Sequence, residues 1–251
     1  MPTEPAYHRL AAVLRTQILS GELPPGAKLP SETRLMEQHG ISRSVAKWAI
    51  ATLKGEGLVV GRAGSGVYVR DGHRLVRYAH GREMRTGSGP TSPFARDAEQ
   101  AGRTPTWEHD SRHDVADESI ARRLAIEPGA PVMRTSYRFL ADDEPIQLST
   151  SWEPLAITAG TPVEWPEAGA AVGVGVVARL DSIGVRIDEF EERLTDRPAL
   201  PDEMEALALT PTSATVWVIE RTYYAAGVPT ETATIVLPRG RYELVYRVPV
   251  L

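Results

Sequence analysis

The chain has 251 residues, no cysteine and a formal net charge of −5 at pH 7. Its length exceeds one typical domain and fits two, and an apolar fraction of 42% is enough for folded cores. No apolar run is long enough to span a membrane, and the N-terminus lacks the charged-then-apolar order of a secretory signal. Without cysteine there are no disulfides and no thiolate chemistry. We therefore expect a two-domain cytoplasmic protein.

Charge is divided unevenly along the chain. Residues 1–75 hold ten Lys and Arg against six Asp and Glu, a net charge of +4, and the remainder holds eighteen against twenty-seven, a net charge of −9. A basic N-terminal part before an acidic part is expected when only the first part meets nucleic-acid phosphates. The alternative is a random scatter of surface charge.

Three helices and a hairpin are predicted in the basic part. The first helix has an apolar stripe at helical spacing and ends at Gly21. Ser31 can cap a second helix that Gly40 ends, and Ser42 can cap a third helix. Residues 58–69 then read as two short strands joined by a glycine-rich turn.

The start of the third predicted helix combines cations and hydroxyls. Arg43, Ser44 and Lys47 share roughly one face, because residues three and four apart are neighbours on a helix. A helix N-terminus also favours a phosphate through its free N–H groups and its dipole. Helix-turn-helix proteins place such a helix start in the major groove of DNA. The hairpin tip, Gly64-Ser65-Gly66, is small enough to approach a groove closely.

This stretch resembles the winged helix-turn-helix domain of GntR-type bacterial transcription regulators. The similarity spans residues 7–69 and rests on the run LPSE…GISR…EGL…GSGVYV. It implies contacts with double-stranded operator DNA through Ser31, Thr33, Arg34, Ser42, Arg43, Ser44, Lys47, Gly64, Ser65 and Gly66. Two positions depart from the family pattern. Lys47 stands where arginine is usual and lacks its bidentate fork, and Thr33 stands where a DNA-contacting arginine is frequent.

A change in amino-acid composition separates the two predicted domains. Residues 73–95 are rich in Gly, Ser and Pro without hydrophobic period and are predicted to be a linker. It would join a DNA-binding domain, residues 1–72, to a second domain, residues 96–251. We interpret the arginines of the linker, Arg77 among them, as part of a solvated hinge, with extra phosphate contacts as the alternative.

Strands and helices alternate beyond the linker. Strands are predicted at 132–140, 146–152, 185–194, 214–224, 230–237 and 242–248, and helices at 119–126, before 183 and at 202–209. Residues 124–149 and 207–233 share the order helix end, proline, strand, turn, proline and strand. This echo indicates a duplicated half-sheet with a cleft where the halves meet.

The second part resembles the effector-binding UTRA domain of the HutC branch of GntR regulators, which is similar in fold to chorismate lyase. The resemblance covers about residues 95–248 and rests on looser motifs, among them Arg221-Thr222-Tyr223-Tyr224 and Gly227-Val228-Pro229. It implies an α+β fold class for the chain. An N-terminal winged helix-turn-helix domain would precede a C-terminal α/β effector domain with a mainly antiparallel sheet.

The same resemblance implies an effector pocket formed by Ser136, Arg138, Ser149, Gly175, Val176, Val177, Glu231 and Leu237. Relatives that sense phosphorylated sugars grip the phosphate with an Arg-x-Arg pair, where this chain has Ser136 and Arg138. A buried phosphate needs several donors. We therefore expect a larger effector, less anionic than a sugar phosphate, oriented by Arg138 and Glu231. The alternative is that Arg138 pairs with Glu231 or Asp142 and that no small molecule binds.

Catalytic and metal chemistry find little support in the sequence. No nucleophile elbow surrounds a serine, and His109-x3-His113 with Asp110 and Asp114 is more typical of a solvated polar strand than of a metal site. We expect no cofactor. The main interpretation is a cytoplasmic, nucleoid-associated homodimer that represses from a palindromic operator until a small-molecule effector releases it. The alternatives are an enzyme with a chorismate-lyase-like second domain and a ligand-free DNA-binding protein.

Overall fold

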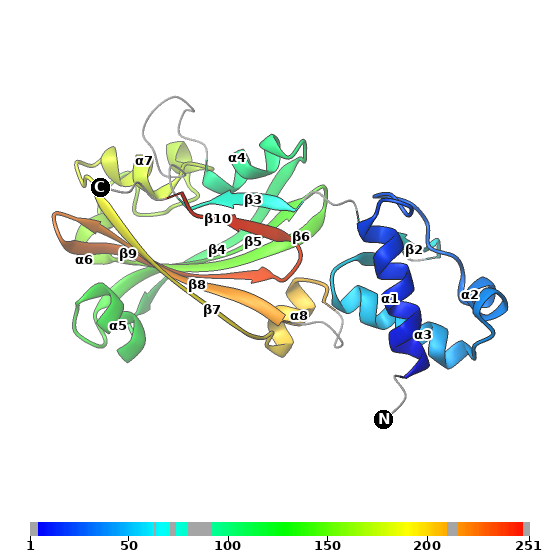
Figure 1. Ribbon diagram of the computed structural model, residues 1–251. Helices are drawn as coiled ribbons and strands as arrows, with labels where there is room; N and C mark the ends of the chain where they lie inside the picture. Colours follow the sequence, from blue (N-terminus) through cyan, green and yellow to red (C-terminus); the bar gives the residue numbers. More distant parts are fainter. Residues whose placement is uncertain (1–4, 63, 71–73, 80–91, 210–214, 248–251) are drawn as a thin grey trace. The chain divides into compact units, whose positions relative to one another are not determined.

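The computed structural model describes the chain apart from residues 1–4, 63, 71–73, 80–91, 210–214 and 248–251 (Figure 1). The chain divides into two compact units. The first comprises residues 1–74, 199–215 and 239–241, and the second, which we call the sheet unit, comprises residues 75–198, 216–238 and 242–251. Among the described residues, no helix combines the length and the apolar character that crossing a membrane requires.

Residues 6–69 of the first unit form a winged helix-turn-helix, which we call the head. Its elements are α1 (Ala6–Leu19), α2 (Glu32–His39), α3 (Arg43–Gly55), β1 (Val59–Arg62) and β2 (Gly66–Val69). The two strands pair antiparallel and form the wing. A short helix, α8 (Pro201–Ala206), belongs to the same unit.

Capping side chains fix the helix boundaries of the head. Ser31 Oγ accepts a hydrogen bond from Arg34 N at 3.2 Å, and Ser42 Oγ accepts one from Val45 N at 3.4 Å. Gly40 ends α2 with a φ of 62°, a left-handed conformation that a residue without Cβ adopts at little cost. The caps and the helix end predicted from the sequence are therefore confirmed.

The three helices of the head share one apolar core. Its buried members come from all three helices, the connection before α2 and the wing, and they are Leu10, Ala11, Leu14, Leu29, Leu35, Ala46, Ala49, Ile50, Leu53, Val59 and Val69. Four of these residues lie on α3 at helical spacing. Because one face of α3 packs into this core, its polar face is left to solvent.

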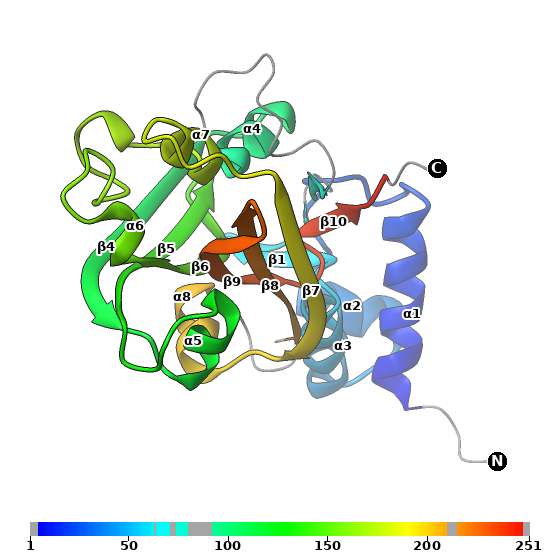
Figure 2. The same cartoon turned by 90° about the vertical axis from the view of Figure 1, so that its left-hand side faces the viewer.

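A six-stranded sheet of order β4-β5-β6-β9-β8-β7 forms the body of the sheet unit (Figure 2). In that order the strands are β4 (Pro105–Val115), β5 (Pro131–Ala141), β6 (Glu144–Pro154), β9 (Val228–Pro238), β8 (Thr215–Ala225) and β7 (Glu189–Pro198). The β5–β6 and β8–β9 hairpins pair antiparallel, and β6 pairs with β9. Two similar hairpins thus meet at the centre of the sheet, as the sequence echo predicts.

Helices cover both faces of this sheet (Figures 1 and 2). On one face lies α5 (Glu118–Leu124), where the Arg123 guanidinium donates to Thr234 Oγ1 on β9 at 2.9 Å. On the other face lie α4 (Pro93–Gln100) and α7 (Val176–Asp181). The remaining short helices of the unit are α6 (Leu155–Thr158) and a 3-10 turn at Gly169–Ala171.

A separate pair of parallel strands, β3 (Leu75–Tyr78) and β10 (Tyr242–Val245), joins the two ends of the sheet unit. Leu75 and Tyr242 pack in one apolar cluster with Phe94 of α4. β3 and the start of α4 fall inside the predicted linker, of which residues 80–91 lie outside the described part. β3 carries too few residues for a periodic signal, because it is stabilised by a partner more than 160 residues away in sequence.

Candidate DNA-binding surface and ligand cavity

The start of α3 presents the predicted cationic and hydroxyl side chains to solvent. Arg43, Ser44 and Lys47 are all exposed, and the Arg43 side chain retains 77% of its accessible area. Ser42 Oγ lies 3.0 Å from Ser44 Oγ, so the capping hydroxyl and its neighbour form a pair at the helix N-terminus. The structure therefore brings together two cations, two hydroxyls and free helical N–H groups, a combination suited to a phosphate.

Arg43 is held in place by the preceding helix. Its Nε donates to Glu32 Oε2 at 3.0 Å. Thr33 and Arg34 follow Glu32 in the first turn of α2, and both are exposed, as is Ser31. All the residues predicted from α2 and α3 to contact DNA thus lie on exposed helix starts.

The wing carries its glycine tip and two further cations. Gly64, Ser65 and Gly66 are exposed, and Ser65 Oγ lies 2.6 Å from the Tyr68 hydroxyl. The Arg62 guanidinium lies over the Tyr68 ring at 4.4 Å, and Lys28 Nζ lies 5.9 Å from the same ring. Sequence reasoning did not single out Arg62 or Lys28, because their grouping depends on the wing pairing across to the connection before α2.

Within the sheet unit, a solvent-open cavity encloses about 770 Å³ of empty space including its mouth. Strands β3, β4, β5, β6, β8 and β9, the start of α4 and the segment entering α7 contribute its walls. The lining residues are Arg77, Ser92, Pro93, Phe94, Trp107, Tyr137, Phe139, Gln147, Ser149, Ser151, Glu153, Glu167, Gly173, Val174, Gly175, Val176, Arg179, Arg221, Glu231 and Ile235.

Strand periodicity explains which predicted residues reach this cavity. On β5 the side chains of Tyr137 and Phe139 line it, and those of Ser136 and Arg138 do not. Arg138 instead pairs across the strands with Glu108 of β4, at 3.1 Å between Nη1 and Oε2. Ser136 and Arg138 therefore do not line this cavity, because neighbouring side chains on a strand point to opposite faces.

The six other predicted effector residues do not all reach the cavity. Ser149, Gly175, Val176 and Glu231 line it. Val177 is buried in the cluster that α7 forms with Leu180 and Tyr223, and Leu237 is buried in the apolar cluster around Leu75. Neither Val177 nor Leu237 lines the cavity. Arg138 and Glu231, expected to orient one ligand together, are not brought to the same site.

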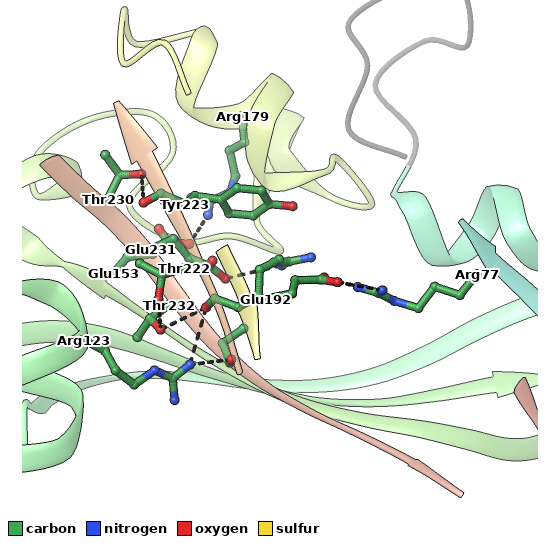
Figure 3. A network of polar contacts seen from close by, with 12 residues as sticks. Arg77, Arg123, Glu153, Arg179, Glu192, Thr222, Tyr223, Thr230, Glu231 and Thr232 are labelled. Carbon is green, nitrogen blue, oxygen red and sulfur yellow. Dashed lines mark hydrogen bonds and ion pairs between the residues drawn. The ribbon is translucent and has the colours of Figure 1, made fainter. Parts of the chain in front are cut away.

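The arginines that line the cavity form ion pairs, of which Figure 3 shows Arg179 with Glu153 and Arg77 with Glu192. Arg179 pairs with Glu153, and both side chains are 2% exposed. Arg77, predicted to lie in a solvated hinge, is buried and pairs with Glu192 of β7. Arg221 Nη2 lies 3.7 Å from Glu231 Oε1, which is fully buried. Buried ions need such partners, because an isolated charge in a protein interior is strongly unfavourable.

Glu167 is held differently from the other cavity carboxylates. Its Oε2 accepts hydrogen bonds from Trp107 Nε1 at 3.3 Å and from Gly173 N at 3.0 Å. The Tyr137 hydroxyl is also hydrogen-bonded to Glu167. Burial raises the pKa of Tyr137, and the negative charges of Glu167 and Glu153 raise this pKa further. Tyr137 therefore stays a neutral hydrogen-bonding group.

The polar strand with two histidines does not gather metal ligands. His113 Nε2 lies 2.9 Å from Glu164 Oε1, and the imidazole stacks on Trp165 at 5.1 Å between ring centroids. Among the described residues, no group of three or more His, Cys, Asp or Glu side chains is placed to hold a metal ion.

Comparisons with known proteins agree with this architecture. A family model described as bacterial regulatory proteins, gntR family, matches residues 6–69, and a UTRA domain model matches residues 100–243. A crystal structure described as that of a GntR-family transcriptional regulator is 42% identical, with 99% of each chain covered and a TM-score of 0.64.

Two named bacterial proteins are similar over nearly the whole chain. The HTH-type transcriptional regulator Rv0792c of Mycobacterium tuberculosis is 28% identical, over 98% of this chain and 86% of that protein. The HTH-type transcriptional repressor NagR of Bacillus subtilis is 27% identical, over 96% of this chain and 94% of that protein.

Proposed function

The chain belongs to the GntR family of bacterial regulatory proteins and carries a UTRA domain, and from this premise we propose that it is a dimeric repressor released from a palindromic operator by a small molecule. The family consists of DNA-binding transcriptional regulators in which the UTRA domain binds the effector. The dimer, the operator symmetry, the repression and the site residues are the parts proposed here.

The observation that carries the DNA-binding site is the exposed start of α3 beside the wing. Arg43, Ser44 and Lys47 stand on the solvent face of a helix whose other face packs into the head core. A helix of this kind enters the major groove with its N-terminal residues on base edges. Arg62 and the tip Gly64-Ser65-Gly66 would meet the adjacent backbone or minor groove.

Two heads would bind two half-sites, because a two-fold symmetric dimer matches a symmetric operator. Regulation then needs a molecule whose affinity differs between the DNA-binding arrangement and another arrangement of the dimer. The cavity in the sheet unit, with its lining of buried ion pairs and aromatic rings, is the proposed effector site. Acting on an operator, the protein would work at the nucleoid.

Selection from a random duplex library with the full chain tests the proposal and identifies the operator in the same experiment. The enriched sequences should contain an inverted repeat, and ultracentrifugation of the complex should give two chains per duplex. Enrichment of a single half-site bound by one chain would contradict the dimeric arrangement. Absence of any enriched sequence at low salt would contradict operator recognition itself.

The enzyme alternative finds no support in the comparisons, because the matched families and relatives are transcription regulators. The cavity argues against the alternative of a DNA-binding protein without a ligand. A domain that served only as a dimer scaffold would gain little from an open cavity lined by charged groups, because buried ion pairs are a costly way to fill a core.

A further inference from the structure

We propose that the effector carries a protonated amine on a flat apolar body. This inference rests on the proposed function, because it assigns a chemical class to the ligand of the same cavity. The sequence predicts an effector less anionic than a sugar phosphate. The cavity goes further, because its walls favour a ligand with a positive charge.

The cavity lining holds three arginines and three glutamates, but Arg77 pairs with Glu192 outside the lining, so the ion pairs among the described residues leave Glu167 without an arginine. Each arginine has a carboxylate near it: Arg179 has Glu153, Arg77 has Glu192, and Arg221 has Glu231. Glu167 is a fourth carboxylate. It is hydrogen-bonded to an indole N–H, a backbone N–H and a phenol, all of them neutral. A cation in the cavity would therefore balance the charge that these neutral donors leave in place.

Glu153 supplies a second, independent indication. This residue lines the cavity and is 1% exposed. Its Oε1 faces Arg179, while its buried Oε2 and the Nε of Arg179 both lack a hydrogen-bond partner among the residues that the structure describes. A buried carboxylate oxygen without a donor is costly. A ligand N–H that reached Glu153 Oε2 would remove this cost, and a phosphate oxygen would increase it by repulsion.

Tyr137 connects the two carboxylates. Its hydroxyl is hydrogen-bonded to Glu167, and the negative charges of both Glu167 and Glu153 act on it. Both charges raise the pKa of Tyr137 more than Arg179 lowers it. At the Tyr137 hydroxyl the two carboxylates therefore outweigh Arg179, which favours an ammonium group beside this hydroxyl.

Aromatic rings form the other part of the proposed site. The rings of Tyr137 and Phe139 stack with 5.2 Å between centroids and an interplanar angle of 11°, and the ring centroid of Phe94 lies 4.6 Å from that of Phe139. Trp107 and Val176 also line the cavity. Flat apolar groups pack well on such rings, and ring faces attract a cation as well. The aromatic side chains Tyr137 and Phe139 of β5 thus line the cavity in place of the expected Ser136 and Arg138.

Three compounds with the same ring and different charges test the proposed ligand class. Full-length protein would be titrated at neutral pH with 2-phenylethylamine, 2-phenylethanol and phenylacetate, which are cationic, neutral and anionic. Binding is measured by calorimetry and by the shift in Tm. The amine should bind about tenfold or more tightly than the alcohol, and phenylacetate should show no binding. Equal or tighter binding of the alcohol or of phenylacetate overturns the proposal, as does no binding of the amine at millimolar concentration.

Matched variants identify the carboxylate that causes the preference for the amine. Glu167→Gln keeps an acceptor oxygen and removes the charge, so the preference for the amine over the alcohol should fall to near unity. Glu164→Gln removes a carboxylate from the same connection outside the cavity lining and should leave the preference unchanged. An unchanged preference in Glu167→Gln overturns the assignment of this carboxylate. The Tm of each variant without ligand shows whether it is folded, which matters most for Glu153→Gln because Arg179 would lose its ionic partner.

The DNA complex separates this inference from the function on which it rests. Each compound would also be added to the protein bound to its selected operator. Preferential binding of the amine without release of DNA would support the ligand class and contradict the effector role. Release by phenylacetate alone would support the effector role and contradict the ligand class.

Discussion

Arg43 Nε donates to Glu32 Oε2 at 3.0 Å, so the first residue of α3 is joined to the first residue of α2. The bond crosses the turn of the helix-turn-helix motif. It orients a guanidinium that otherwise remains 77% exposed. A side chain that is oriented before binding loses less conformational freedom when it meets DNA.

Removing this guanidinium should weaken operator binding. We expect Arg43→Ala to cost about 1–3 kcal/mol of specific binding free energy, because an arginine on a base edge supplies that much discrimination. The operator affinity of Arg43→Lys should lie between those of the unchanged protein and Arg43→Ala, since lysine keeps the charge and loses the planar fork. Fluorescence anisotropy with the selected operator measures the loss. An affinity for the operator that does not change in Arg43→Ala would refute the placement of α3 in the groove.

Two lysines at opposite ends of α3 offer a matched pair. Lys47→Ala should reduce the slope of log K against log salt by about one, because one phosphate contact is lost. Lys54 lies in the last turn of the helix, and Lys54→Ala should leave the slope nearly unchanged while removing the same charge. Titrations of both variants at several salt concentrations separate a local contact from the effect of net charge, and identical slopes would argue for the latter.

The wing offers a matched pair of glycines. Gly66 has a φ of +119°, and a Cβ added there would lie 2.9 Å from Lys28 Cε. Gly64 has a φ of +68° with nothing within 4 Å of the added Cβ. We expect Gly64→Ala to cost about 1 kcal/mol through its left-handed conformation, and Gly66→Ala to cost more, up to about 3 kcal/mol. Thermal unfolding compares the two, and a larger loss in Gly64→Ala would contradict the wing geometry.

Acid should weaken the β5–β6 hairpin through Asp142. The backbone N–H of Thr104 and the Arg103 guanidinium donate to its carboxylate and lower the pKa of Asp142 below its ordinary value of 3.8. Because the folded-state pKa is depressed, the contribution is present above pH 3.8 and is lost as pH falls through the folded-state pKa. Asp142→Asn should lack this acid-dependent loss. Urea unfolding of both proteins across acidic pH measures the difference, and parallel pH curves would exclude this contribution.

The head was largely predictable because its signals are local. Ser31, Gly40 and Ser42 each act within a few residues of their own position, and each ends or begins a helix as predicted. The exposed face of α3 follows from the same helical period. Arg62 and Lys28 were missed because their common contact with Tyr68 depends on strand pairing.

The cavity was only partly predictable because its register is not local. On β5 the resemblance pointed to Ser136 and Arg138, whereas the alternating pattern of Tyr137, Arg138 and Phe139 places the two rings on the cavity side. Which face of β5 borders the cavity depends on its pairing with β4 and β6. The burial of Arg77 and Arg179 could not be predicted from the sequence either. An arginine is expected on the surface unless a carboxylate partner is known, and these partners are distant in sequence.

The parallel pairing of β3 with β10 has a consequence for signal transmission. β3 opens the sheet unit at Leu75 and carries Arg77, whose guanidinium borders the cavity. The start of the sheet unit is thus only two residues from a cavity-lining side chain. A molecule bound in the cavity against Arg77 would therefore act on β3, whose position within the sheet unit is fixed by its pairing with the last described strand of the chain, β10.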